Sequence, residues 1–94
     1  MPANEIKFYK GERKEVTAII RPANSNESTV ITSAKYEVTK FFGDNAVIKT
    51  GECEIDGNNL TVLLEFLDTG KYRLEITVSI GRELVIERAY INVE

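Results

Sequence analysis

The chain has 94 residues, with 12 Lys and Arg against 15 Asp and Glu, a single Cys, and neither His nor Trp. That is the length of one domain, and 43% hydrophobic with 29% charged residues is typical of a soluble globular protein. Nucleophile systems that depend on His, zinc sites built from His or several Cys, and an internal disulfide are excluded. We therefore expect one domain over residues 1–94 that is not an enzyme and holds no cofactor or metal.

The net charge of −3 and the isoelectric point near 5.1 disfavour binding to nucleic acid or to an anionic membrane surface. No apolar run approaches the roughly 20 residues that span a bilayer. The first five residues, Met-Pro-Ala-Asn-Glu, lack the basic start of a signal peptide. We expect synthesis in the cytoplasm and protein partners, with neither nucleic acid nor membrane among them.

Val, Ile, Thr, Tyr and Phe make up 34 of the 94 residues, and apolar and polar residues alternate with the period of a strand. In chain order, strands are predicted near residues 6–8, 16–21, 34–39, 46–49, 53–55, 60–66, 72–80 and 83–93. No window has the period of a helix. The pattern predicts an all-β immunoglobulin-like sandwich of about seven to eight antiparallel strands with little or no helix.

Turn residues separate these segments. Asp56-Gly57-Asn58 and Ile80-Gly81-Arg82 predict tight hairpins, and Gly43-Asp44-Asn45 predicts a third turn. Residues 22–28 read as a polar loop.

The last predicted strand changes phase. Leu84 and Ile86 share one face, whereas Ala89, Ile91 and Val93 share the other. One extra residue in a strand moves every later side chain to the opposite face, so we predict a bulge near residues 87–88.

The most specific motif is Asp68-Thr69-Gly70-Lys71-Tyr72. It has the D-x-G-x-Y form of the corner between strands E and F of immunoglobulin-like domains. We predict a tyrosine corner: Gly70 takes a conformation that other residues avoid, and the Tyr72 hydroxyl bonds the backbone just upstream. Leu74 and Tyr36 stand where antibody domains carry Cys and Trp, so we expect them to fill the space between the sheets.

Several segments in order resemble the immunoglobulin-like domain at the N-terminus of phage baseplate upper proteins and related tail or accessory proteins. They are residues 8–12 (FYKGE), 16–21, 33–38 (SAKYEV), 51–57 (GECEIDG) and 70–73 (GKYR). The resemblance covers most of the chain. It implies a non-enzymatic structural or assembly module of a phage or prophage virion, associated with the tail or baseplate. Because the sequence ends at Glu94 without attachment regions for receptor-binding proteins, we expect a small accessory module.

Two groups of apolar residues are candidates for a partner surface. Adjacent side chains of a strand point to opposite faces, so Phe41 and Phe42 cannot both enter one core. Either the strand end packs both, or one contacts a partner or stacks on a sugar. Leu63, Leu67 and Ile19 are predicted on outer faces. They either form a contact with another subunit or are scattered surface residues.

Glu52, Glu54 and Asp56 lie at alternate positions and would share one strand face. A calcium site needs more oxygen ligands from a loop, so we favour a solvated edge.

Two functions remain open from sequence. The first is the virion module, which binds copies of itself or other virion proteins. The second is a ligand- or sugar-binding module that forms part of a larger protein on a bacterial cell surface.

Overall fold

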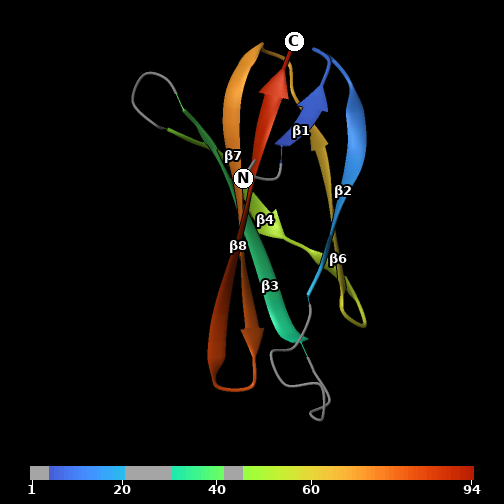
Figure 1. Cartoon of the computed structure of the whole chain (residues 1–94), viewed down its shortest axis with the longest axis vertical. Coiled ribbons are helices and arrows are strands. Elements are labelled where there is room, and N and C mark those ends of the chain that lie inside the picture. Colours follow the sequence, from blue (N-terminus) through green and yellow to red (C-terminus); the bar gives the residue numbers. More distant parts are fainter. Residues whose placement is uncertain (1–4, 21–30, 42–45) are drawn as a thin grey trace.

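The computed structural model describes residues 5–20, 31–41 and 46–94 (Figure 1). They form eight strands: β1 (Glu5–Phe8), β2 (Arg13–Ile19), β3 (Ile31–Lys40), β4 (Val47–Glu52), β5 (Glu54–Asp56), β6 (Asn59–Glu65), β7 (Gly70–Ile80) and β8 (Glu83–Val93). These ranges contain no helix, and hence none long and apolar enough to cross a membrane. The all-β prediction is confirmed.

The strands form two sheets. One has five strands in the order β1-β8-β7-β3-β4, and the other has three in the order β2-β6-β5. Neighbouring strands are antiparallel except β1, which runs parallel to β8, so the prediction of antiparallel strands is wrong for this pair. Strands β1 and β2 are consecutive but lie in different sheets. Strand β1 joins the five-stranded sheet, where it lies beside β8, the last strand. Parallel neighbours need a long connection, and the rest of the domain supplies it.

The predicted hairpins at residues 56–58 and 80–82 are confirmed. Asp56 pairs with Asn59, and Ile80 pairs with Glu83, so each turn has two residues. The predicted turn at residues 43–45 and the polar loop at residues 22–28 lie outside the described residues.

The predicted bulge in the last strand is wrong. Strand β8 pairs with β7 in one unbroken register from Glu83 to Val93. Glu87 pairs with the buried Ile76 and therefore lies on the core-facing side of the sheet, while Leu84 and Ile86 face outward, 70% and 52% exposed. The apparent change of phase comes from two exposed apolar residues, not from an extra residue.

The core lies between the two sheets and is built from alternate residues of each long strand. Leu74 and Tyr36 are buried there, as predicted. Tyr36 packs directly over Gly51: a Cβ at residue 51 would lie 2.8 Å from the Tyr36 Cε1 atom. Residue 51 must therefore lack a side chain for the Tyr36 ring to keep its position.

The tyrosine corner joins β6 to β7. The Tyr72 hydroxyl donates a hydrogen bond to the Asp68 carbonyl oxygen at 2.9 Å, which is the bond that the sequence motif predicts. Burial raises the pKa of the Tyr72 phenol, so the hydroxyl keeps the proton it donates. Gly70 has φ of +141°, in the region that favours glycine.

Three aromatic rings pack beneath this corner. The Phe66 and Tyr72 ring centroids are 4.6 Å apart, and Phe8 meets Phe66 edge-on at 5.0 Å. Phe8 ends β1 and Tyr72 lies in β7, both in the five-stranded sheet, whereas Phe66 directly follows β6 of the other sheet. The cluster therefore fastens the two sheets together at this end.

We expect Tyr72→Phe to lower the free energy of unfolding by about 1–3 kcal/mol, because it leaves the part-buried Asp68 carbonyl without its partner. The ring and its contacts are retained, so urea denaturation reports on the hydroxyl alone. An unchanged midpoint at an unchanged m-value would show that the corner bond contributes nothing to stability.

We expect Gly70→Ala to destabilise the protein by about 1–3 kcal/mol through backbone strain. A Cβ at this position would meet nothing closer than 3.8 Å, so steric overlap is not the cause. The same denaturation measurement tests this. A stabilised variant would mean that residue 70 adopts an ordinary strand conformation in solution.

Candidate interaction surface

Phe41 follows β3 and lies on the outer face of the five-stranded sheet. Its backbone N–H bonds the Lys71 carbonyl oxygen at 2.9 Å. Its ring stacks on Tyr90, with centroids 5.4 Å apart and an interplanar angle of 30°, and the Arg73 guanidinium lies 6.0 Å from the ring centroid. Phe41 is thus half-buried against its own sheet rather than fully presented to a partner.

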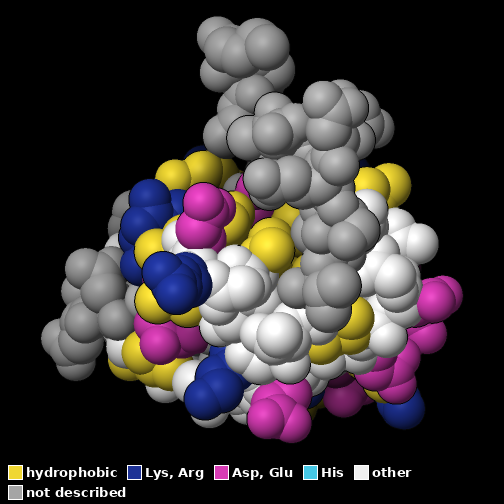
Figure 2. All heavy atoms as spheres, turned by 90° about the horizontal axis from the view of Figure 1, so that it is seen from below, with side chains coloured by type: hydrophobic (Ala, Val, Ile, Leu, Met, Phe, Trp, Pro, Cys, Tyr) yellow, Lys and Arg dark blue, Asp and Glu magenta, His cyan; other side chains and the backbone are white. Residues whose placement is uncertain are grey.

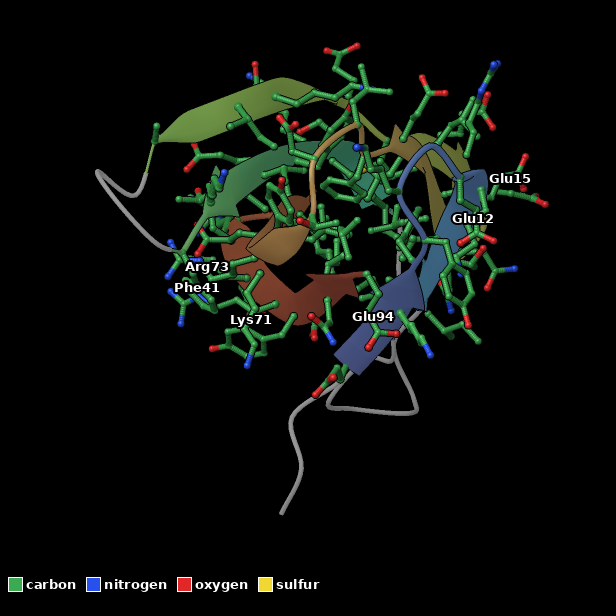
Figure 3. All side chains as sticks on the ribbon, turned by 90° about the horizontal axis from the view of Figure 1, so that it is seen from above. Glu12, Glu15, Phe41, Lys71, Arg73 and Glu94 are labelled. Carbon is green, nitrogen blue, oxygen red and sulfur yellow. The ribbon has the colours of Figure 1, made fainter. Side chains whose placement is uncertain are left out.

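A cavity of about 290 Å³ lies beside this aromatic pair. Its lining includes Glu5, Phe41, Lys71, Tyr90 and Asn92. Seen from above, Phe41, Lys71 and Arg73 lie together on one side of the sandwich, opposite Glu12 and Glu15 (Figure 3). Phe42, the second predicted member of the pair, lies outside the described residues.

Ile19 and Leu63 both lie on the outer face of the three-stranded sheet and are 60% and 51% exposed. Leu63 pairs with Glu15, and Ile19 pairs with Asn59 two rows away. The row between them holds Thr17 and Thr61. Polar side chains therefore separate the two apolar residues on this face.

Leu67 lies beyond the end of β6, before the corner, and is 68% exposed. The four predicted surface residues that the structure describes do not form one patch: Phe41 follows a strand of one sheet, Ile19 and Leu63 belong to the other, and Leu67 lies in the connection between β6 and β7. From the opposite end of the molecule, hydrophobic side chains likewise appear as separate groups among charged ones (Figure 2).

Sequence reasoning missed the apolar pair Leu84 and Ile86. They stand at alternate positions on the outer face of β8, paired with the polar Ser79 and Thr77 of β7. The sequence prediction assigned Leu84 and Ile86 to the core because they are apolar. The two-residue turn at Gly81 fixes the register, in which Leu84 and Ile86 pair with the outward-facing Ser79 and Thr77. This register would have placed both residues outward.

Glu52 and Glu54 do not share a strand face as the sequence predicts. Glu52 ends β4, where it pairs with Lys35 of the five-stranded sheet, and Glu54 begins β5 of the other sheet. Cys53 lies between them, where the chain crosses from one sheet to the other. Both side chains border one cavity of about 340 Å³, which they reach from strands of different sheets.

No protein-family model matches the sequence, and no curated protein does. The chain is similar to the crystal structure of the titin M10–obscurin-like 1 Ig complex, with 13% identity, 98% of this chain and 87% of that chain covered, and a TM-score of 0.54. The fold is immunoglobulin-like. A solved structure of Drosophila OTK extracellular domains 3–5 also matches, with 12% identity, 98% of this chain and 32% of that chain covered, and a TM-score of 0.44.

Cys53 is a free and buried thiol in this immunoglobulin-like fold. Its backbone N–H bonds the Ala34 carbonyl oxygen at 2.9 Å, which holds the crossing against β3. Burial raises the pKa of the thiol, because the thiolate is penalised in apolar surroundings. The thiolate is the reactive form, so the folded environment suppresses its reactivity.

We expect iodoacetamide to alkylate Cys53 at least about tenfold more slowly in the folded protein than in urea-unfolded protein at pH 8, from burial and raised pKa together. Mass spectrometry over time measures both rates, with a free cysteine peptide in the same urea as the control for reagent reactivity. Equal rates would place the thiol at the surface.

Proposed function

We propose that this chain is a non-enzymatic protein-interaction module of a phage or prophage virion, associated with the tail or baseplate. The observation that carries the interaction role is the exposed pair Leu84 and Ile86 on the outer face of β8. Burying one such side chain stabilises a contact by about 1.5–3 kcal/mol, so two neighbours on a rigid strand supply a useful part of an interface.

Three further observations support the proposal. The similar solved structure is a complex of titin M10 with an obscurin-like 1 Ig domain, so in that case the fold has a protein partner. The resemblance of the sequence to baseplate domains supports the virion role. The long register of β7 with β8 provides the rigid platform that such contacts need.

The test is incorporation into particles. We expect the tagged wild-type chain to co-purify with virions of the phage or prophage that encodes it, and Leu84→Glu to reduce this at least about tenfold, because a carboxylate is costly to bury. Leu63→Glu, the same change on the other sheet, is the matched control, and circular dichroism establishes that both variants fold.

Absence of the wild-type chain from the particles would overturn the virion role. Normal incorporation of Leu84→Glu would overturn the role of this surface, whatever the result for Leu63→Glu.

A second candidate function is ligand or sugar binding on a bacterial cell surface. The cavity beside Phe41 and Tyr90 favours it, because aromatic rings together with Glu5, Lys71 and Asn92 offer both stacking and polar contacts. A saccharide titration that shifts the resonances of these residues, and no longer does so in Tyr90→Ala, would support this function over the first.

A further inference from the structure

Within the described residues, the two sheets are closed against each other on one side and open on the other. On the closed side the chain crosses from β4 to β5 and bonds β3 through Cys53. On the opposite side, the turn from β1 to β2 is the one connection between the sheets within the described residues. There the Lys14 ammonium reaches across from β2 and donates to the Lys7 carbonyl oxygen of β1 at 2.6 Å.

Past Lys14 the open side forms a groove of about 620 Å³. Its apolar lining comes from both sheets: Ile6, Val16, Ala18, Leu74, Ile76 and Ala89. Two of these residues are alanines, Ala18 of β2 and Ala89 of β8, so small side chains face the groove from both sheets. Ile19, which the sequence marks as a partner residue, borders the groove at the edge of β2, although its side chain lies on the outer face of that sheet.

Two strand edges border the groove. Strand β2 pairs with β6 on one side, and no described strand pairs with its other edge. Strand β8 pairs with β1 only from Tyr90 to Val93, so the described residues give its edge from Glu83 to Ala89 no partner strand. Such edges present backbone donors and acceptors that can take up a further strand.

The charges at the groove are acidic. Glu87 faces the groove from the core-facing side of β8, and Glu5 lies at its rim. Arg88, the one cation in the lining, is already paired with Glu75 at 2.8 Å on the outer face. Because Arg88 is engaged with Glu75, it does not neutralise Glu5 or Glu87. A ligand in the groove therefore meets negative charge.

We infer that the groove binds an extended segment of another protein, with small apolar and basic side chains in alternation, as a strand added to β2. This rests on the proposed protein-interaction function and specifies the chemistry of the partner. Past Lys14, the core-facing residues of β2 are Val16 and Ala18, which carry no charge, whereas Glu87 protects the edge of β8. A basic side chain of the segment pairs with Glu87, and its apolar side chains fill the groove.

The probe is a nine-residue peptide of alternating valine and polar residues, the polar ones lysine and threonine, titrated into isotope-labelled protein. We expect the amide resonances of β2 to shift and hydrogen exchange at the free edge of β2 to slow, because strand addition gives these amides carbonyl partners. A peptide with glutamate in place of each lysine should bind at least roughly tenfold more weakly.

Reversing the charge tests the role of Glu87. In Glu87→Lys the preference should invert, so that the glutamate peptide binds more tightly than the lysine peptide. Glu54→Lys makes the same change on exposed β5, at the other edge of the three-stranded sheet, and should keep the wild-type preference. Because both variants change the net charge equally, the comparison isolates position.

Three results would overturn the inference: no resonance shift at millimolar lysine peptide, exchange protection along β8 instead of β2, or an equal change of preference in Glu54→Lys. Slowed exchange at β2 that grows with protein concentration, without peptide, would instead make a second copy the occupant. None of these results bears on incorporation into virions, so failure here is separable from failure of the proposed function.

Discussion

The packing of Phe66 between Phe8 and Tyr72 is the interaction on which the rest of the sandwich depends. It is the point where the end of β6 and two strands of the five-stranded sheet meet through aromatic contacts of 4.6 and 5.0 Å. The hydrogen bond from Tyr72 to Asp68 fixes the direction in which β7 leaves this point. Because β7 is a central strand with β8 and β3 on its two sides, an error in its direction would displace most of the five-stranded sheet.

The same end of the molecule also determines where the sandwich stays open. The Gly11 amide donates to the Phe66 carbonyl oxygen at 2.7 Å, and Lys10 donates to the Glu94 carbonyl oxygen at 2.8 Å, so the turn after β1 is bound to both sheets. Beyond it, β1 and β2 belong to different sheets, and β1 has only four residues. Within the described residues, β1 pairs with β8 only from Tyr90 to Val93, and the groove along β2 lies beyond this pairing.

Much of this architecture follows from local sequence. The motif at residues 68–72 predicts the corner because a glycine conformation and one hydroxyl define it, and two-residue turns follow from the glycines between alternating runs. The parallel pairing of β1 with β8 could not be predicted, because it joins residues at opposite ends of the chain. For the predicted partner surface, alternation assigns Ile19 and Leu63 to an outer face, but only the register between strands shows that a row of threonines lies between them.

Glu87 lies where the predicted bulge in β8 was wrong, and its side chain faces the open groove. A carboxylate at a core-facing position is costly when the opposite sheet covers it, so the alternation rule places such a residue outside. Here the side chain reaches water because no strand of the described part lies over that stretch of β8. The charge discourages pairing of this edge with another copy, whose own Glu87 would meet like charge in a symmetric pairing of the two β8 edges. It also selects among other strands by charge, and so the residue that breaks the sequence pattern is the one that gives the open side of the sandwich its specificity.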